Sequence, residues 1–270
     1  MNLLVSVVIP CFNHGKFIDE AVNSVLNQTF QDFEIIIVND GSTDEFTNEL
    51  LKNYSKPKTK VIMTENQGVS VARNVGIKEA KGKYILPLDA DDKILPAYLE
   101  KAVKIIEENT KFGIIYCEAE FFGAKTEKWN LPEYRFSDIL NGNCIFCTAL
   151  FRKSSWKKVN GYKKEMKNAW EDYEFWLSLI EIGEEVYRIP EVLFQYRQHK
   201  ISSRNNSADA RKTRLLLHKQ IIKFHLQMYY NNLKFLKSKT LKMFILKIKI
   251  QMYVNKVFLY LKSHVSKINS

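Results

Sequence analysis

Short apolar runs alternate with amphipathic stretches along the first 95 residues of the chain. The apolar runs are rich in Val, Ile and Leu and end in polar or glycine residues, which is typical of strands buried on both faces of a parallel sheet. The stretches between them repeat apolar residues every three or four positions, as one face of a helix does. Strands are predicted at residues 5–10, 33–38, 60–64 and 84–88, and helices at 17–26, 44–54 and 69–80. This alternation predicts a mostly parallel, doubly wound α/β sheet.

The remainder of the chain is less regular, and its last part changes character. From Asp209 onwards apolar residues step by three and four over long distances, and Asn231 and Asn232 mark a turn between two helices. We therefore divide the chain into an α/β domain at 1–207, with halves at 1–95 and 96–207, and a helical tail at 208–270. Within the second half, strands are predicted at 114–122, 143–151, 185–190 and 192–198, with a variable stretch at 123–138.

Composition limits the class of protein. A chain of 270 residues with 46% hydrophobic content can bury a large core. Its four cysteines lack disulfide-rich spacing, which favours a reducing compartment, and the Cys144-x-x-Cys147 pair is interpreted as core cysteines because no second pair completes a zinc site. The N-terminus is interpreted as a first strand, not a signal peptide, and no run of 18 apolar residues exists that would span a membrane. A cytoplasmic location is expected.

The positive charge is concentrated in the tail. Residues 208–270 hold 14 Lys and Arg against one acid, Asp209, whereas residues 1–207 hold 27 basic and 29 acidic residues. Lys242, Lys249 and Lys256 recur every seven residues and so share one helical face. Basic and apolar residues together predict binding to an anionic membrane surface. The alternative is that the apolar stripe packs on the α/β domain or on a second subunit; nucleic acid is not expected, because no recognised motif accompanies the charge.

Carboxylates follow two of the predicted strands. Asp40 lies two residues after the end of the strand at 33–38, and Asp89, Asp91 and Asp92 follow the strand at 84–88. A solvated turn would explain such residues, but it has no need of three acids within four positions. Open α/β sheets bind ligands at the carboxyl ends of their strands, so the second cluster is interpreted as a site for a divalent cation and phosphate oxygens.

A second pair of acids begins a predicted helix further along. Glu171 and Asp172 precede an apolar helical face. Such residues stabilise a helix N-terminus through its dipole by about 0.3 to 1 kcal/mol. The alternative is that one of them acts as a general base.

Four segments together resemble a known family. Ser-Val-Val-Ile-Pro-Cys-Phe-Asn-His, Ile-Val-Asn-Asp-Gly-Ser-Thr-Asp, Asn-Gln-Gly-Val-Ser-Val-Ala-Arg-Asn-Val-Gly and Leu-Asp-Ala-Asp-Asp occur in this order. They resemble the nucleotide-binding half of the family 2 glycosyltransferases of GT-A fold, over residues 4 to 95. The resemblance implies that Pro10 and Asp40 lie against the nucleobase and that Arg73 reaches the base or the phosphates. Asp89 would hold the ribose, Asp91 would ligate Mn²⁺ or Mg²⁺, and Asp92 would support the loop.

The second half adds two further resemblances. The segment around Glu171 and Asp172 is similar to the family's Glu-Asp motif, which implies that Asp172 is the general base and Glu171 an acceptor contact. The segment from Tyr196 to His199 resembles the family's Tyr-Arg-x-His motif, which implies that His199 contacts the metal or the pyrophosphate, with Arg197 and Lys200 shielding the leaving diphosphate. The chain departs from the family at Ser178, where members often carry an arginine nearby on this helix.

The resemblance implies an inverting glycosyltransferase of the hexosyl- or N-acetylhexosaminyl-transferase class. Its donor would be a UDP-sugar and its acceptor a hydroxyl of a glycan or lipid-linked molecule. The basic tail adds the hypothesis that the protein attaches to the inner face of the membrane as part of bacterial surface-polysaccharide assembly. A polyprenyl-phosphate sugar synthase and a non-catalytic sugar-nucleotide or glycan-binding relative are the alternatives. The presence of Asp40, Asp91 and Asp172 argues against a non-catalytic relative. A nucleotidyltransferase would carry a glycine-rich basic loop after the first strand, and residues 11–16 do not resemble one.

Overall fold

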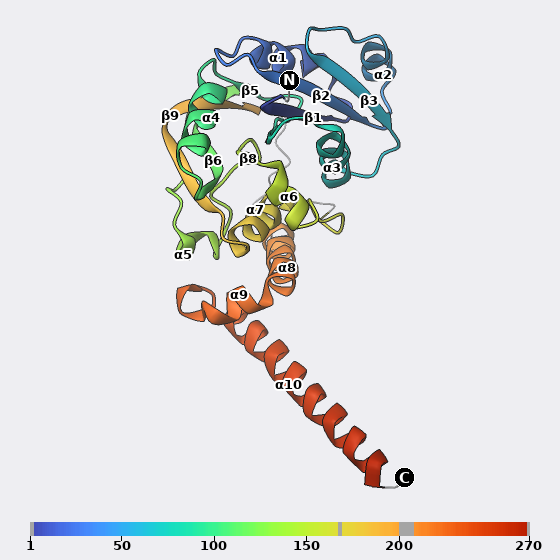
Figure 1. Cartoon of the computed structure of the whole chain (residues 1–270), viewed down its shortest axis with the longest axis vertical. Helices are drawn as coiled ribbons and strands as arrows, with labels where there is room; N and C mark the ends of the chain where they lie inside the picture. Colours follow the sequence, from blue (N-terminus) through green and yellow to red (C-terminus); the bar gives the residue numbers. More distant parts are fainter. Residues whose placement is uncertain (1–2, 167–168, 200–207, 269–270) are drawn as a thin grey trace. The chain divides into compact units, whose positions relative to one another are not determined.

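The first half of the chain builds a parallel sheet with helices on both faces (Figure 1). The computed structural model describes residues 3–166, 169–199 and 208–268. The strands run in the order β3-β2-β1-β4 and all pair in parallel, as predicted. The elements are β1 (Val5–Cys11), α1 (Gly15–Leu26), β2 (Phe33–Asp40), α2 (Glu45–Lys52), β3 (Thr59–Thr64), α3 (Val69–Glu79) and β4 (Tyr84–Pro87).

The strand order reverses direction between β3 and β4. Helices α1 and α2 therefore lie on one face of the sheet and α3 on the other, because crossover connections are right-handed (Figure 1). Every residue of β1 is buried, as a central strand covered on both faces should be. The reversal leaves a crevice at the carboxyl ends of β1 and β4, and this is where doubly wound sheets bind ligands.

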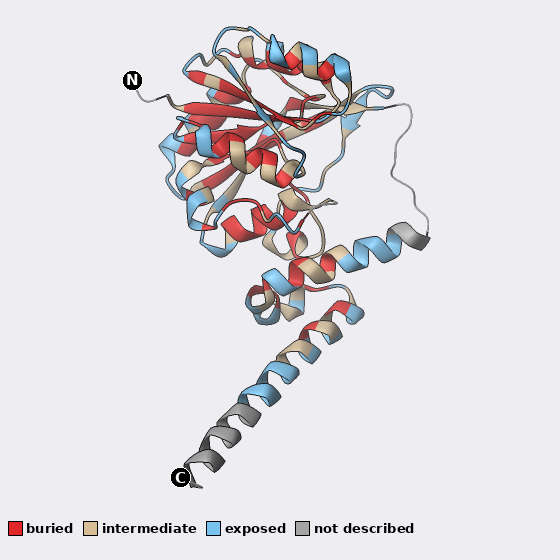
Figure 2. Cartoon of the chain, turned by 90° about the vertical axis from the view of Figure 1, so that its right-hand side faces the viewer, coloured by how far each residue is buried: buried red, intermediate tan, exposed pale blue. Residues whose placement is uncertain are grey.

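The second half extends the same sheet with mixed strand directions. The order continues β4-β8-β6-β9-β5, with β7 paired to β6, and β8 runs antiparallel to both β4 and β6. Figure 2 shows that the central strands are buried and that the outer faces of the helices are exposed, whereas β3, β7 and β9 are only partly buried. The elements are β5 (Lys93–Ile94), α4 (Tyr98–Glu108), β6 (Phe112–Gly123), β7 (Glu127–Trp129), β8 (Leu150–Arg152), α6 (Lys153–Lys158), α7 (Glu171–Glu181) and β9 (Glu185–Gln198).

Two predicted strands differ from the structure. The apolar run at 143–151 is a strand only from Leu150, because residues 143–149 form a buried irregular segment whose apolar content reflects burial and not sheet pairing. The predicted pair at 185–190 and 192–198 is one strand, β9, which runs parallel to β6. Its register shifts after Ile189, where Pro190 and Glu191 have no partner across the sheet. Proline cannot donate to a strand ladder, so the break in the sequence pattern marks a bulge and not a turn.

The chain divides into two compact units: Met1–Tyr134 with Asn143–Asn205, and Arg135–Gly142 with Asn206–Ser270. The second contains α5 (Phe136–Ile139), α8 (Ala208–Phe224), α9 (Leu226–Asn231), a 3-10 helix at Leu233–Phe235 and α10 (Lys239–Ile268). Asn141 connects its two segments, because its Nδ2 donates to the Phe235 carbonyl at 3.0 Å and its Oδ1 accepts from the Lys237 N–H at 2.8 Å.

The assignment of residues 135–142 to the helical unit was not anticipated, because no local pattern in the sequence records this long-range packing. The predicted domain boundary after Ser207 falls at residues 200–207, which lie outside the described part of the chain, and it stays a prediction. Among the described helices, none is both long enough and apolar enough to cross a lipid bilayer.

Candidate active site

A cleft of about 600 Å³ opens at the carboxyl ends of the central strands. It is lined by side chains from β1, β2, α3, the loop after β4, and the start of α7. Six of the eight site residues expected from the sequence line this cleft: Pro10, Asp40, Arg73, Asp89, Asp91 and Glu171. The other two are Asp172, which follows Glu171 on α7, and His199, which contacts Asp91.

Asp40 ends β2 and is buried at the edge of the cleft. Its Oδ1 accepts the Gln67 N–H and its Oδ2 accepts the Gly68 N–H, both at 2.9 Å. Gly68 has a φ of +90°, a backbone conformation that glycine adopts without steric cost, and it caps the start of α3. Each carboxylate oxygen keeps a second lone pair for a ligand donor. The contact of Asp40 and Pro10 with a nucleobase stays a prediction.

Arg73 joins the two halves of the site. It lies on α3 with only 2% of its side chain exposed, so it is not the solvated cation that an amphipathic helix usually carries. Its Nη2 is 2.8 Å from Asp89 Oδ1 and its Nη1 is 2.7 Å from Glu171 Oε1. Burial opposes the charge on Arg73, but the Asp89 and Glu171 carboxylates outweigh it and raise its pKa well above the usual value.

Arg73 and Asp89 were both expected to contact the nucleotide, and in the structure they contact each other. Both terminal nitrogens of the guanidinium contact carboxylates, and among the described residues its Nε has no hydrogen-bond partner. Direct contacts of Arg73 with base or phosphate, and of Asp89 with ribose, stay predictions. What the geometry establishes is that one buried cation holds together the carboxyl end of β4 and the beginning of α7.

Asp91 lies between two histidines. Its Oδ2 is 2.7 Å from His199 Nε2 and its Oδ1 is 3.7 Å from His14 Nδ1. His14, which follows β1, was given no role from the sequence, although it ends the first of the four segments that resemble the family. Within the described ranges, no group of three or more His, Cys, Asp or Glu is arranged to hold a metal ion. One carboxylate and one imidazole nevertheless suit a divalent cation that takes its other ligands from a diphosphate and water.

The loop that carries Asp91 is fixed to the end of β9. Asp92 is buried, and its Oδ1 accepts the Arg197 N–H at 2.8 Å. Arg197 in turn donates from Nε to the Asp91 carbonyl at 2.8 Å. Asp92 thus supports the loop, as expected, and Arg197 holds the segment that contains His199. Lys200 lies outside the described residues.

Asp172 sits in the first turn of α7, after a strained residue. Trp170 precedes the helix with a φ of +66°, a left-handed conformation that costs a residue other than glycine about 1 to 3 kcal/mol and is found most often at functional sites. Asp172 Oδ2 accepts from Asn143 Nδ2 at 3.0 Å and its Oδ1 from the Tyr173 N–H at 2.7 Å. Burial of the carboxyl group and the nearby Glu171 charge raise the pKa of Asp172 to about 7.

The buried segment before β8 brings two residues to the site that sequence reasoning did not place there. Asn143 contacts Asp172, and the Cys147 thiol lies 3.4 Å from Asp89 Oδ2. Cys144 is buried, as predicted, whereas Cys147 belongs to the site and not simply to the core. Burial and the Asp89 charge raise the pKa of Cys147, so the thiol stays protonated and donates to that carboxylate.

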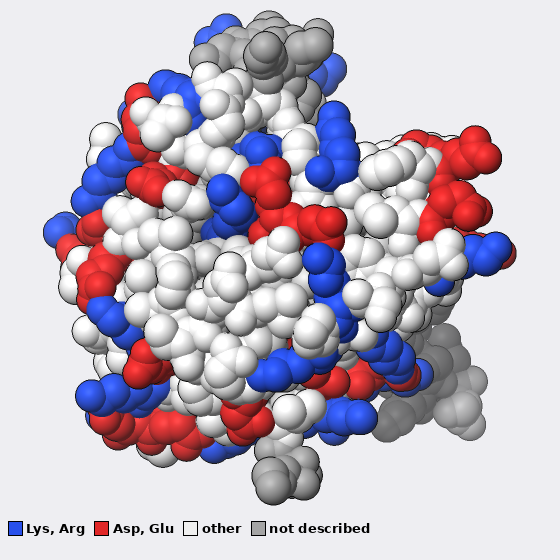
Figure 3. Space-filling model, turned by 90° about the horizontal axis from the view of Figure 1, so that it is seen from above, with Lys and Arg blue, Asp and Glu red and all other residues white. Residues whose placement is uncertain are grey.

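Charge on the molecular surface is mixed in sign. In Figure 3, a group of Asp and Glu side chains near the centre of the face is bordered by Lys and Arg. This agrees with the near balance of acidic and basic residues over residues 1–207.

A family model, relatives in sequence and a solved structure all compare this chain with glycosyltransferases. The family described as Glycosyl transferase family 2 matches residues 6–159. An uncharacterized glycosyltransferase of Rickettsia prowazekii is 32% identical over 216 residues, which cover 76% of this chain and 67% of the relative. TuaG of Bacillus subtilis, a glycosyltransferase named for teichuronic acid biosynthesis, is 32% identical over 232 residues, 82% of this chain and 90% of its own. The structure of S. aureus TarS 1–349 in complex with UDP-GlcNAc superposes with a TM-score of 0.67 at 22% identity, covering 86% of this chain and 72% of that one.

Proposed function

The chain belongs to glycosyltransferase family 2, and we propose that it transfers a sugar from a UDP-sugar, with inversion, to a hydroxyl of a glycan or lipid-linked acceptor. The enzyme is a glycosyltransferase of GT-A fold. The proposed mechanism rests on the ion-pair network Asp89–Arg73–Glu171. This network fixes the start of α7, so that Asp172, a carboxyl group of raised pKa, lies beside the cleft that holds Asp40 and Asp91.

The donor binds along the cleft in this proposal. Asp40 accepts a hydrogen bond from the nucleobase while its backbone partners hold it rigid, and Pro10 forms the apolar wall beside the base. Asp89 holds the ribose, with its charge shared between Arg73 and the Cys147 thiol. Asp91 and His199 would hold a Mn²⁺ or Mg²⁺ ion, which when bound supplies positive charge against the diphosphate oxygens.

Asp172 removes the acceptor proton as the new bond forms. The acceptor oxygen attacks the anomeric carbon from the face opposite the diphosphate, the bond from that carbon to the diphosphate oxygen breaks, and its electron pair leaves with the diphosphate. The hydroxyl proton passes to the Asp172 carboxylate, whose pKa of about 7 suits a general base near neutral pH. Such a base contributes about 10² to 10⁴-fold to the rate. Glu171, which lines the cleft and is held by Arg73, is the proposed acceptor contact.

Transfer is tested with a panel of labelled UDP-sugars and glycan or lipid-linked acceptors, followed by the anomeric configuration of the product. The proposal expects one UDP-sugar to be consumed and a product of opposite anomeric configuration to form. A product that retains the donor configuration would contradict the proposed role of Asp172, because single attack with a base on the far side must invert the centre.

A further inference from the structure

Helix α10 carries two apolar sides. Leu241 and Ile245 are buried within the helical unit and Ile248 is half-buried, so one side of the helix packs against its own unit. A second set of apolar residues is exposed by between 42% and 71%. At 3.6 residues per turn this second set spans roughly 100° of arc on the side opposite the packed one. We name it the outer stripe: Met243, Leu246, Ile250, Tyr253 and Val254.

Lysines border the outer stripe on both edges. Lys242, Lys249 and Lys256 follow one edge and Lys247 the other, again by helical phase. Helix α10 contains seven lysines and no acidic residue over residues 239–268. Lys249 is also held in place, because its Nζ lies 4.9 Å from the centre of the Tyr230 ring and donates to Gln227 Oε1 at 2.6 Å.

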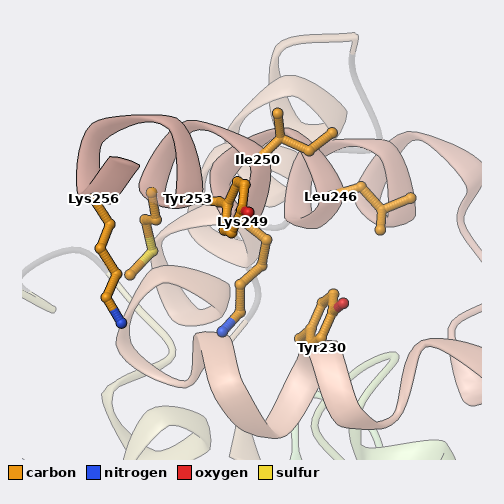
Figure 4. A pocket seen from close by; sticks show the side chains of 7 residues that line it. Tyr230, Leu246, Lys249, Ile250, Tyr253 and Lys256 are labelled. Atoms are coloured by element: carbon orange, nitrogen blue, oxygen red, sulfur yellow. The ribbon is translucent and has the colours of Figure 1, made fainter. Parts of the chain in front are cut away.

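The lysine edge forms one wall of a groove between α9 and α10. The groove has a volume of about 540 Å³, and its apolar lining includes Tyr230, Leu246 and Tyr253. Figure 4 shows Lys249 directed toward Tyr230, and Leu246 and Ile250 of the outer stripe also line the groove. The apolar side chains of the outer stripe are therefore continuous with a partly apolar groove that has charged groups at its margin.

We propose that the outer stripe of α10 lies in the interfacial region of an anionic lipid bilayer, with the helix parallel to the membrane plane. Apolar side chains flanked on both edges by lysines are the arrangement of an interfacial helix, in which the apolar face enters the acyl boundary and the ammonium groups meet anionic headgroups. Tyr253 suits this depth, because its ring is apolar and its hydroxyl is polar. No described helix is apolar enough to cross the bilayer, so the interaction stays at the surface.

Charge decides between a bilayer and a second copy of the chain. Two copies joined through their outer stripes would bring seven lysines from each helix together without one acid from either. Such like charges oppose association, whereas each lysine near an anionic membrane surface contributes favourably. A nucleic acid would satisfy the lysines but would leave the five apolar side chains of the outer stripe without an apolar partner.

The test uses the full chain and large vesicles of phosphatidylcholine with and without phosphatidylglycerol, separated by flotation. Wild-type protein is expected to float with the anionic vesicles only, and less so at high salt. Ile250→Gln is expected to raise the lipid concentration for half-maximal binding by about tenfold, because it removes one aliphatic side chain that the bilayer would bury. Ile182→Gln is the matched control, since Ile182 is 43% exposed at the end of α7, outside both the outer stripe and the groove, and should leave binding unchanged.

Three results would overturn the proposal: wild-type protein that binds neither kind of vesicle, equal effects of Ile250→Gln and Ile182→Gln, or binding of equal strength to neutral vesicles. A wild-type dimer in analytical ultracentrifugation that Ile250→Gln dissociates, without vesicle binding, would assign the outer stripe to a second copy. Circular dichroism of each variant checks that the helices are intact. Because the assay contains neither nucleotide nor acceptor, its outcome is independent of the proposed transfer reaction.

Discussion

The guanidinium of Arg73 lies between two carboxylates, 2.8 Å from Asp89 and 2.7 Å from Glu171. Asp89 follows the last parallel strand of the first half, and Glu171 begins a helix of the second half, so a single buried cation sets the position of one half of the site relative to the other. This contact explains how a cleft assembled from segments 82 residues apart in the sequence keeps a fixed geometry.

Replacing Arg73 by Ala is expected to destabilise the fold by about 3 kcal/mol or more, because Asp89 and Glu171 would lose their shared cation in a largely buried position. Urea denaturation measures the change in the free energy of unfolding. Lys60→Ala is the control, since Lys60 and Glu79 form an exposed pair worth about 1 kcal/mol or less. Equal small losses for the two variants would mean that the network contributes little to stability.

The pH dependence of transfer is expected to follow Asp172. Because burial and Glu171 raise the pKa of this carboxyl to about 7, the ionised base is lost as pH falls, and kcat/KM should fall tenfold per pH unit well below 7 and level off above it. Asp172→Asn should lose about 10² to 10⁴-fold and show no such inflection. A full rate maintained at pH 5 would exclude Asp172 as the base. A small loss in Asp172→Asn would instead favour an acceptor that is already ionised, such as a polyprenyl phosphate.

Asn143 is expected to tune this base. Its amide donates to Asp172 Oδ2 at 3.0 Å and so favours the ionised carboxylate. Asn143→Ala should therefore raise the pKa of Asp172 and move the inflection in kcat/KM to higher pH, with the limiting rate at high pH less affected. Asn109→Ala, at an exposed position, should leave the profile in place. An unchanged inflection in Asn143→Ala would show that the hydrogen bond does not influence the base.

Asp40→Asn tests the nucleobase end of the cleft. Both carboxylate oxygens of Asp40 accept backbone N–H groups, from Gln67 and Gly68, whereas an asparagine side chain offers only one oxygen. One N–H would lose its acceptor, which costs about 1 to 3 kcal/mol, and the group that meets the base would be displaced. We expect UDP affinity to fall at least tenfold by calorimetry, which is about 1.4 kcal/mol. Unaltered affinity would remove Asp40 from the donor site.

The sequence predicted the first half of the molecule well, because parallel strands and amphipathic helices leave local patterns that do not depend on distant contacts. The strand limits of β1, β2 and β3 and the cluster of Asp40, Asp89 and Asp91 at one sheet edge follow directly from those patterns. From these patterns most of the site residues could be expected to line one cleft.

The residues that escaped prediction act through tertiary contacts. Asn143 and Cys147 lie in an apolar segment whose pattern predicts a strand. The segment is irregular instead, and its side chains contact Asp172 and Asp89. The outer stripe of α10 escaped for a similar reason. The heptad of lysines and the packed apolar side could be recognised in the sequence, but only the fold shows which apolar side remains uncovered.

Calorimetric titration of UDP, GDP and dTDP, with and without Mn²⁺, on wild type and Asp91→Ala tests the proposed donor site most directly. We expect that UDP binds, that Mn²⁺ strengthens the binding, and that Asp91→Ala abolishes this strengthening while the protein remains folded. Failure of folded wild-type protein to bind any of the three nucleotides, in either condition, would contradict it.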